Sequence, residues 1–357
     1  MPRLALLLLI GACGGGGGAT KVVAPKQSAV DEKQAEKDAK GLVTEIYETI
    51  GRGSKDSLFS LLDDSLVVFG PRQIDALATR ADTLVALSEV IDLKTKKKVT
   101  LSSGSLEVVA SRGGRSAWAF DIVTVDGEPH AVTAILVNTD DLWQLDAALV
   151  AHTPEKGSMK AELAKDAVVP PGAGAKTKID PDAKAAVERF QKGLLDQAQW
   201  GADLGSRSDA IVVGPVAGEV TRGKKEIKKL WKKRLEAKVR AAASGDIVAG
   251  TTPDGELAWV SAPITRVAEG EDPLPLRAFA VFEKNGGDWK LIALHESLAI
   301  SEPGSGTSFK KIVPPKEAEK PVVAEKPAKV EKKAPVKKKK KKQKKKKKQP
   351  KPDDDDE

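Results

Sequence analysis

The stretch NGGDWKLIALHES, residues 285–297, carries the clearest local structural signal in the chain. Asn-Gly-Gly is typical of a tight hairpin turn, because glycine accepts the positive φ angles that such a turn requires. Side chains alternate along a strand, which places His295 and Glu296 on opposite faces. The stretch therefore predicts a C-terminal hairpin with strands over 274–284 and 287–300.

The residues that precede this hairpin predict further helices and strands. Asp180 followed by Pro181 is a typical helix N-terminus, and apolar residues then recur at helical spacing as far as Ala198. After this helix the pattern predicts a strand over 210–213, a helix over 224–239, and strands over 245–250 and 256–267.

The same order of elements occurs earlier in the chain. Three landmarks correspond between the two blocks: Gly70-Pro71 with Gly214-Pro215, Trp118 with Trp259, and Trp143 with Trp289. We therefore expect a tandem repeat of one helix–strand–helix–meander unit. The elements predicted in the earlier block are helices over 42–50, 54–62 and 73–92, and strands over 66–69, 97–103, 105–111, 115–125, 129–138 and 142–151.

This unit resembles the SnoaL-like branch of the nuclear transport factor 2-like superfamily. The closest local match is Asp288-Trp289-Lys290-Leu291 followed by His295-Glu296-Ser297, whereas Leu149 stands at the position of His295 in the earlier block. The resemblance implies an α+β fold of two cystatin-like rolls, in which a curved antiparallel sheet wraps helices around a conical pocket. The superfamily contains isomerases, cyclases and dehydratases as well as non-catalytic members.

Composition divides the rest of the chain. Residues 310–357 hold 20 lysines and 9 acids, so this tail has a net charge of +11 and the remainder has −3 of the total of +8. The tail is too poor in apolar residues to fold, and we expect disorder. The expected division is a signal peptide over 1–12, a tether over 13–40, a first roll over 41–153, a linker over 154–178, a second roll over 179–301, and a disordered tail over 302–357.

Cys13 is the only cysteine, and it follows Arg3, an apolar run and the small residues Gly11 and Ala12. This order resembles the lipidation signal of bacterial lipoproteins and implies a membrane anchor on Cys13. The alternative is an ordinary signal peptide with an incidental cysteine. Gly14 is not the aspartate that retains many lipoproteins in the inner membrane, so the outer membrane is favoured.

The lysine run of the tail has three interpretations. In an exported protein it would contact anionic lipid, lipopolysaccharide or an acidic cell-wall polymer. In a cytosolic protein it would contact nucleic acid, which export makes unlikely, and the remaining alternative is a solvated spacer. The lysines concerned are Lys337, Lys338, Lys339, Lys340, Lys341, Lys342, Lys344, Lys345, Lys346, Lys347 and Lys348.

Candidates for chemistry are few. The resemblance implies an acid or a histidine in a roll pocket, for which His295 and Asp209 are the candidates, with Arg277 as an anion partner. His295 is expected to face the pocket; the alternative is a core histidine satisfied by a neighbour. Glu296 is a further candidate, and Asp121, Asp146 and His130 are weaker ones. The three histidines are scattered, and neither a metal nor a cofactor is expected.

Two further sets of residues allow two readings each. Trp118, Trp143, Trp259 and Trp289 either line an apolar ligand pocket or, more commonly, pack against the helices. The helix expected over 224–239 is strongly basic, and it is either a solvated surface or a surface that rests on anionic lipid. Its basic residues are Lys224, Lys225, Lys228, Lys229, Lys232, Lys233 and Arg234.

The function expected from the sequence is that of a lipid-anchored envelope protein with two non-catalytic binding rolls and a polycationic tail. The alternatives are an isomerase-like, cyclase-like or dehydratase-like enzyme acting in the second roll, and a polyanion-binding protein if the chain is not exported. Rolls of this family often pair through their sheets, so we expect pairing either within the chain or in a homodimer.

Overall fold

The computed structural model describes residues 32–70, 76–84, 100–165, 179–205 and 209–300. The first half consists of α1 (Glu32–Arg52), α2 (Lys55–Leu61), β1 (Leu62–Phe69), β2 (Ala76–Leu77), β3 (Leu101–Ser103), β4 (Glu107–Ala110), β5 (Ser116–Val125), β6 (Glu128–Thr139) and β7 (Leu142–His152). The second half consists of α4 (Met159–Lys165), a 3-10 turn (Pro181–Ala183), α5 (Lys184–Leu195), α6 (Gln197–Asp203), β8 (Ile211–Val213), β9 (Val220–Arg222), α7 (Lys224–Glu236), β10 (Arg240–Ala243), β11 (Val248–Thr251), β12 (Leu257–Val267), β13 (Leu274–Asn285) and β14 (Asp288–Leu298).

The described strands form two seven-stranded sheets of the same topology. The first has the order β2-β1-β7-β6-β5-β3, with β4 also on β5; the second has the order β9-β8-β14-β13-β12-β10, with β11 also on β12. In each sheet the long meander is antiparallel, and the first strand, β1 or β8, pairs in parallel with the last long strand. The predicted α+β class with curved sheets is confirmed, and the strand order repeats as the sequence landmarks predicted.

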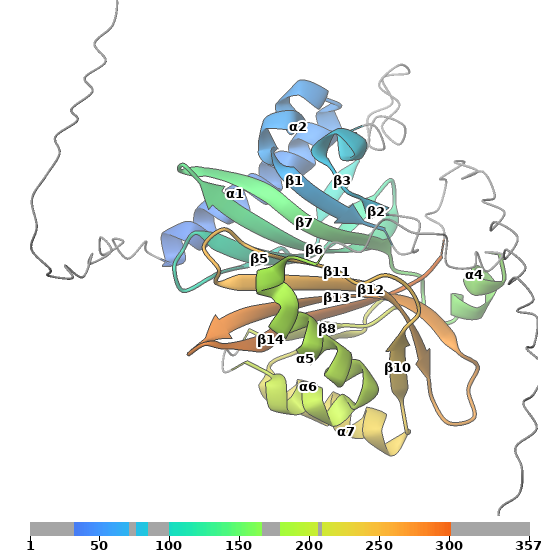
Figure 1. Cartoon of the computed structure of the whole chain (residues 1–357). Coiled ribbons are helices and arrows are strands. Elements are labelled where there is room, and N and C mark those ends of the chain that lie inside the picture. Colours follow the sequence, from blue (N-terminus) through green and yellow to red (C-terminus); the bar gives the residue numbers. More distant parts are fainter. Residues whose placement is uncertain (1–31, 71–75, 85–99, 166–178, 206–208, 301–357) are drawn as a thin grey trace, which may run out of the picture. The chain divides into compact units, whose positions relative to one another are not determined.

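Each sheet has helices on one of its faces (Figure 1). In the first half, Leu42 and Ile46 of α1 belong to a buried cluster with Ala119 and Ala134 of the sheet. In the second half, α5, α6 and α7 cover a larger cluster, which includes Phe190, Trp200 and Trp231. Burial of these apolar faces is the main driving force for helix packing on the sheets.

The other faces of the two sheets meet in a third buried cluster. Phe69 and Trp118 come from the first sheet and Trp259 and Phe279 from the second, and Phe69 contacts Trp259 edge-on with 5.9 Å between the ring centroids. Polar contacts also cross this layer; in one of them, the Ser116 hydroxyl donates to the carboxylate of Asp254 at 2.7 Å. We call this layer the inter-sheet layer.

Several expected boundaries are wrong. α1 begins at Glu32, so residues 32–40 are helical and do not belong to a tether. The buried residues of that first part are Ala35 and Ala39, whose small side chains give a weak hydrophobic signal. Within the segment expected as a helix over 73–92, residues 76–77 form the strand β2, because Leu77 pairs with Val68 at the edge of the sheet. Residues 80–84 are helical as expected, and residues 73–75 and 85–92 lie outside the described residues.

Three corrections concern the second half. The helix expected to run through Ala198 divides into α5 and α6 at Asp196, whose side chain accepts a hydrogen bond from the Ala198 amide at 2.9 Å and caps the second helix. The helix expected over 224–239 ends at Glu236, and the chain then forms β10. The strand β9 was not predicted at all.

Candidate functional site

Glu296 is the buried acid on the helix-covered face of the second sheet. It lies on β14 and is 2% exposed. Arg234 of α7 donates to both carboxylate oxygens, at 3.1 and 2.7 Å, and Arg266 of β12 donates to Oε2 at 2.6 Å. Arg234 thus binds the carboxylate in a bidentate manner from α7, and Arg266 binds it at the same time from β12.

The electrostatic environment keeps Glu296 ionised. Burial alone would raise the pKa of Glu296, but Arg234 and Arg266 outweigh burial and hold it below its usual value. A general acid or base requires a pKa near the working pH and a free position for the proton. Glu296 meets neither requirement, so the arrangement is suited to holding α7 on the sheet.

The sequence pattern predicts that Arg234 lies among the solvated lysines of this helix, and that prediction is wrong. Arg234 follows the buried Ile227 by seven positions and Trp231 by three, which puts all three on one helix face. This spacing was the available signal. The partner acid could not be recognised, because Glu296 is 62 positions away in the sequence.

Aromatic side chains fill the space next to this ion-pair cluster. Trp200 of α6 stacks on Trp231 of α7 with 6.4 Å between ring centroids, and Phe190 of α5 meets Trp200 edge-on at 6.0 Å. A Cβ added at Gly193 would lie 2.4 Å from the Trp200 ring. The helices are therefore in close contact with one another, and their aromatic residues form core.

His295 lies on the face opposite to the expected one. It points into the inter-sheet layer, where its Nδ1 shares a hydrogen bond with the Thr133 hydroxyl of the first sheet at 3.0 Å. The side chain is 0% exposed, and burial lowers the pKa of His295 to about 3 although the neighbouring Glu296 opposes this. The imidazole is therefore neutral at physiological pH. Alternation was predicted correctly, but the face assigned to the helices was wrong.

Arg277 also lies in the inter-sheet layer. It is 2% exposed, its Nη1 donates to the Ser261 hydroxyl at 3.2 Å, and its guanidinium lies 5.1 Å from the centroid of the Phe69 ring. Asp209 stands just before β8, the strand that pairs in parallel with β14 at Val213 and His295. Arg277 and His295 thus share a layer, as expected, but that layer lies between the sheets.

The four matched tryptophans separate into two pairs. Trp118 and Trp259 are buried in the inter-sheet layer, whereas Trp143 and Trp289 belong to the clusters on the helix-covered faces. Trp143 and Trp289 therefore pack on the helix side of their sheets, whereas Trp118 and Trp259 do not. The Trp259 indole donates across the layer to the carboxylate of Asp146 at 3.3 Å.

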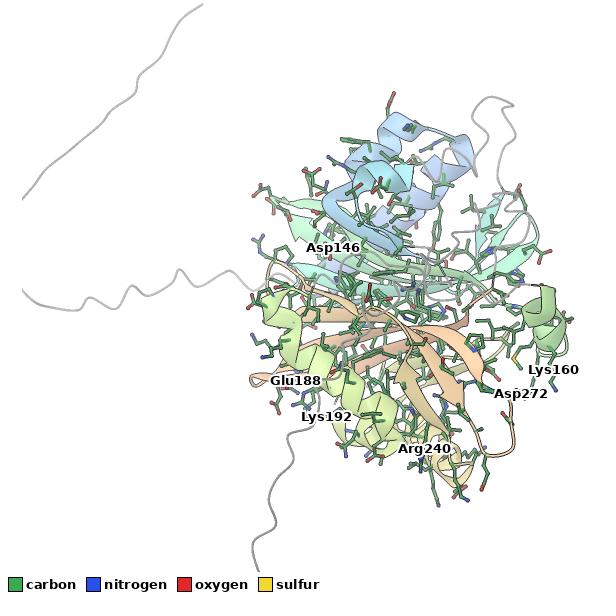
Figure 2. The ribbon with its side chains drawn as sticks, turned by 45° about the vertical axis from the view of Figure 1, so that its right-hand side comes forward. Asp146, Lys160, Glu188, Lys192, Arg240 and Asp272 are labelled. Atoms are coloured by element: carbon green, nitrogen blue, oxygen red, sulfur yellow. The ribbon has the colours of Figure 1, made fainter. Side chains whose placement is uncertain are left out.

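Asp146 and Asp63 form a pair of acids at the edge of the inter-sheet layer. The Ser65 hydroxyl donates to Asp63 at 2.6 Å and lies 3.4 Å from Asp146. Burial and the charge of Asp63 raise the pKa of Asp146 to about 6, although the contacts with Trp259 and Ser65 oppose the shift. Figure 2 labels Asp146 on the first sheet.

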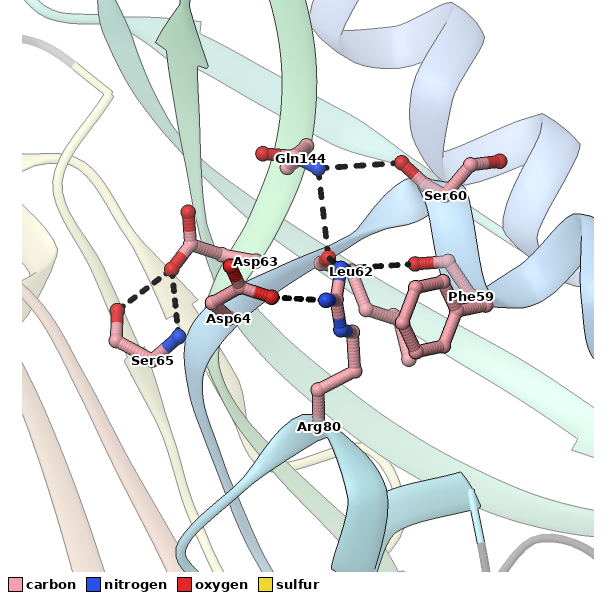
Figure 3. Close-up of polar contacts among 8 residues, drawn as sticks. All are labelled: Phe59, Ser60, Leu62, Asp63, Asp64, Ser65, Arg80 and Gln144. Atoms are coloured by element: carbon pink, nitrogen blue, oxygen red, sulfur yellow. Dashed lines mark hydrogen bonds and ion pairs between the residues drawn. The ribbon is translucent and has the colours of Figure 1, made fainter.

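Local backbone structure produces this arrangement. The ladder between β1 and β7 is irregular between Leu62 and Val67, which frees the intervening residues from regular pairing. Arg80 binds the neighbouring Asp64 and stacks on Phe59, with 3.6 Å to the ring centroid (Figure 3). Asp64 thus has Arg80 as its ion-pair partner. The sequence named Asp146 only as a weak candidate, because its partners are distant in the chain.

The helix-covered face of the first sheet holds a different buried acid. Asp121 of β5 is 1% exposed, and one of its oxygens accepts a hydrogen bond from the Ser105 amide at 2.9 Å. Burial first, and then the charge of Asp121, raise the pKa of Tyr47 on α1 above its usual value. The second half has Glu296 on another strand, so the two halves do not repeat one set of ionisable residues.

Other predicted sites receive only a partial answer. Within the described ranges no three His, Cys, Asp or Glu side chains are grouped so as to hold a metal ion. No helix within those ranges is both long enough and apolar enough to cross a bilayer. Cys13 and the lysines of the tail lie outside the described residues.

One protein family and several solved structures are similar to parts of this chain. Residues 197–301 match the SnoaL-like domain family. Similar solved structures include an NTF2-like protein from Pseudomonas putida KT2440 (13% identity, TM-score 0.32, 35% of this chain and 92% of that one) and a putative dehydratase of the NTF2-like family from Streptomyces avermitilis (15% identity, TM-score 0.30, 34% and 99%). A cystatin-like protein from Nostoc punctiforme is also similar (9% identity, TM-score 0.30, 35% and 95%). No curated protein matches the sequence significantly.

Proposed function

We propose that the protein is a non-catalytic binding or scaffolding protein of the bacterial envelope, anchored by lipid on Cys13. The absence of catalysis in this proposal rests on Glu296, because arginine side chains bind both of its carboxylate oxygens. His295, another candidate of the second half, is neutral and bonded to Thr133 between the sheets. Glu296 and His295 are thus both engaged by residues of the folded core.

The anchor and the tail complete this proposal. The apolar run before Cys13 and the small residues next to it favour cleavage and lipidation there, with the outer membrane as the favoured site. The polycationic tail then contacts anionic envelope polymers such as lipopolysaccharide or acidic cell-wall polymer.

The test of the anchor is mass spectrometry of the mature N-terminus in the wild type and in Cys13→Ala. We expect a wild-type chain that begins at Cys13 and carries diacylglycerol, and a variant that is neither cleaved at this site nor found in the membrane fraction. Gly14→Ala is the matched control and should be processed normally. A wild-type chain that retains Met1 without lipid would refute export and restore nucleic acid as the partner of the tail.

The acid pair Asp63–Asp146 favours a second candidate function. Two adjacent carboxylates, one with its pKa raised to about 6, are a common arrangement for general acid–base catalysis. An isomerase-like or dehydratase-like activity would therefore be located at the edge of the inter-sheet layer instead of at His295. Turnover of a candidate substrate that persists in Asp146→Asn would exclude this site.

A further inference from the structure

The helix α7 presents a fixed basic surface. Seven of its thirteen residues are basic and two are acidic. Ile227 and Trp231 bury one face in the core, and Arg234 holds the carboxylate of Glu296. These three contacts set the rotation of the helix about its axis, so the outward direction of its lysines is determined by the fold.

One flank of the helix carries a row of lysines that ends beside Glu236. Lys224, Lys228 and Lys232 recur at intervals of four, which aligns them over about 12 Å of the helix axis. All three are exposed. Lys232 lies 3.9 Å from Glu236, and elsewhere on the helix Lys229 pairs with Glu226 at 2.8 Å. Each row of lysines therefore has one acidic partner, and the helix as a whole stays strongly basic.

An apolar side chain continues the basic flank. Leu235 lies three positions after Lys232, on the same side of the helix, and is 42% exposed. We define Lys224, Lys228, Lys232 and Leu235 as the α7 flank. The main apolar face of α7 is buried in the core. What the α7 flank offers a membrane surface is a lysine row for the headgroups, with one apolar side chain for the boundary with the acyl chains.

We propose that the α7 flank binds anionic lipid headgroups and thereby orients the folded part of the chain against the membrane. This proposal rests on the envelope location proposed above. Charge complementarity favours anionic lipid, and Leu235 favours a membrane over a soluble polyanion, since an apolar side chain gains nothing from phosphate contacts. The flank carries no aromatic residue on which nucleic-acid bases would stack.

The test uses the full chain with Cys13→Ser, so that lipidation plays no part. Leu235→Cys is then the only cysteine and carries an environment-sensitive dye; Leu142→Cys, at a site that is 66% exposed in the first half, is the matched control. Each labelled protein is titrated with phosphatidylcholine vesicles with and without phosphatidylglycerol. We expect a blue shift at position 235 only, and only with the anionic vesicles.

A second comparison isolates the lysines from the tail. Lys224→Gln/Lys228→Gln/Lys232→Gln is compared with a control triple, in which Lys37, Lys40 and Lys55 of the first half are changed to Gln, so both lose the same charge. Three lysines at a membrane surface correspond to roughly a 100-fold difference in partitioning before salt screening. We expect the half-maximal lipid concentration to rise at least tenfold in the first triple and to change little in the control.

Two outcomes would overturn the proposal. One is an unshifted dye at position 235 while the protein sediments with anionic vesicles, because the tail alone would then account for binding. The other is an equal shift with a DNA duplex, which would assign the flank to polyanions in general. Both outcomes leave the lipidation of Cys13 to be decided separately by the mass of the mature N-terminus.

Discussion

The pH dependence of stability should reveal the neutral burial of His295. Its pKa is lowered to about 3 in the folded protein by burial, whereas an unfolded histidine has a pKa of about 6.5. Protonation below pH 6.5 therefore favours the unfolded chain, and the stabilising contribution of the neutral ring is lost as the pH falls toward 3. Between pH 7 and pH 5 the linkage relation gives a loss of about 2 kcal/mol from this residue.

The assay is equilibrium unfolding in urea, followed by tryptophan fluorescence at both pH values. His295→Gln removes the titrating group, so the variant should lose about 2 kcal/mol less than the wild type between pH 7 and pH 5. His130→Gln, which leaves His295 in place, should keep most of the wild-type loss. If His295→Gln and the wild type lose the same free energy of unfolding within about 0.5 kcal/mol, the buried neutral histidine is refuted.

Three further predictions concern other contacts. Glu296→Gln leaves two arginines without their anion and should lower the free energy of unfolding by about 3 kcal/mol in chemical denaturation; a loss below about 1 kcal/mol would contradict the ion-pair cluster. Gly193→Ala should lower the melting temperature through a clash with Trp200 that costs roughly 1–3 kcal/mol. Its matched control is Gly201→Ala, where a Cβ meets nothing within 4 Å and helix propensity should raise stability by up to about 1 kcal/mol. Asp146 has a raised pKa, so its ionisation lowers the free energy of unfolding as the pH rises from about 4 to 6. Asp146→Asn should remove this pH dependence and raise the free energy of unfolding by about 1 kcal/mol at pH 7, after allowance for partial exposure. If the pH profile of stability is the same in the variant and the wild type, the pKa of Asp146 is not perturbed.

Short-range patterns predicted the strands and the repeat well. The turn at 285–287 is present, with Gly286 and Gly287 both at positive φ. Asp140 and Asp141 adopt positive φ at the matching turn of the first half, so the two hairpins agree in backbone geometry despite different residues. Local turn chemistry and alternation suffice for such elements, because they depend on neighbours in the sequence.

The sequence predicted element bounds poorly where the hydrophobic pattern is weak, and it did not predict contacts between residues that are distant in the chain. The first turns of α1 bury only alanines, and β9 is a strand of three residues. The ion-pair cluster of Glu296 joins β14 to a residue 62 positions away and another 30 positions away. Contacts over such separations have no signature in a single sequence, because any of the many arginines could have been the partner.

The sequence by itself determined that His295 and Glu296 lie on opposite faces of one strand, since strand geometry requires it. It did not determine which face meets the helices. Both faces of the second sheet are apolar, because α5, α6 and α7 cover one and the first sheet covers the other. Periodicity cannot distinguish two buried faces, so only tertiary packing decided that Glu296 meets the arginines and that His295 lies between the sheets.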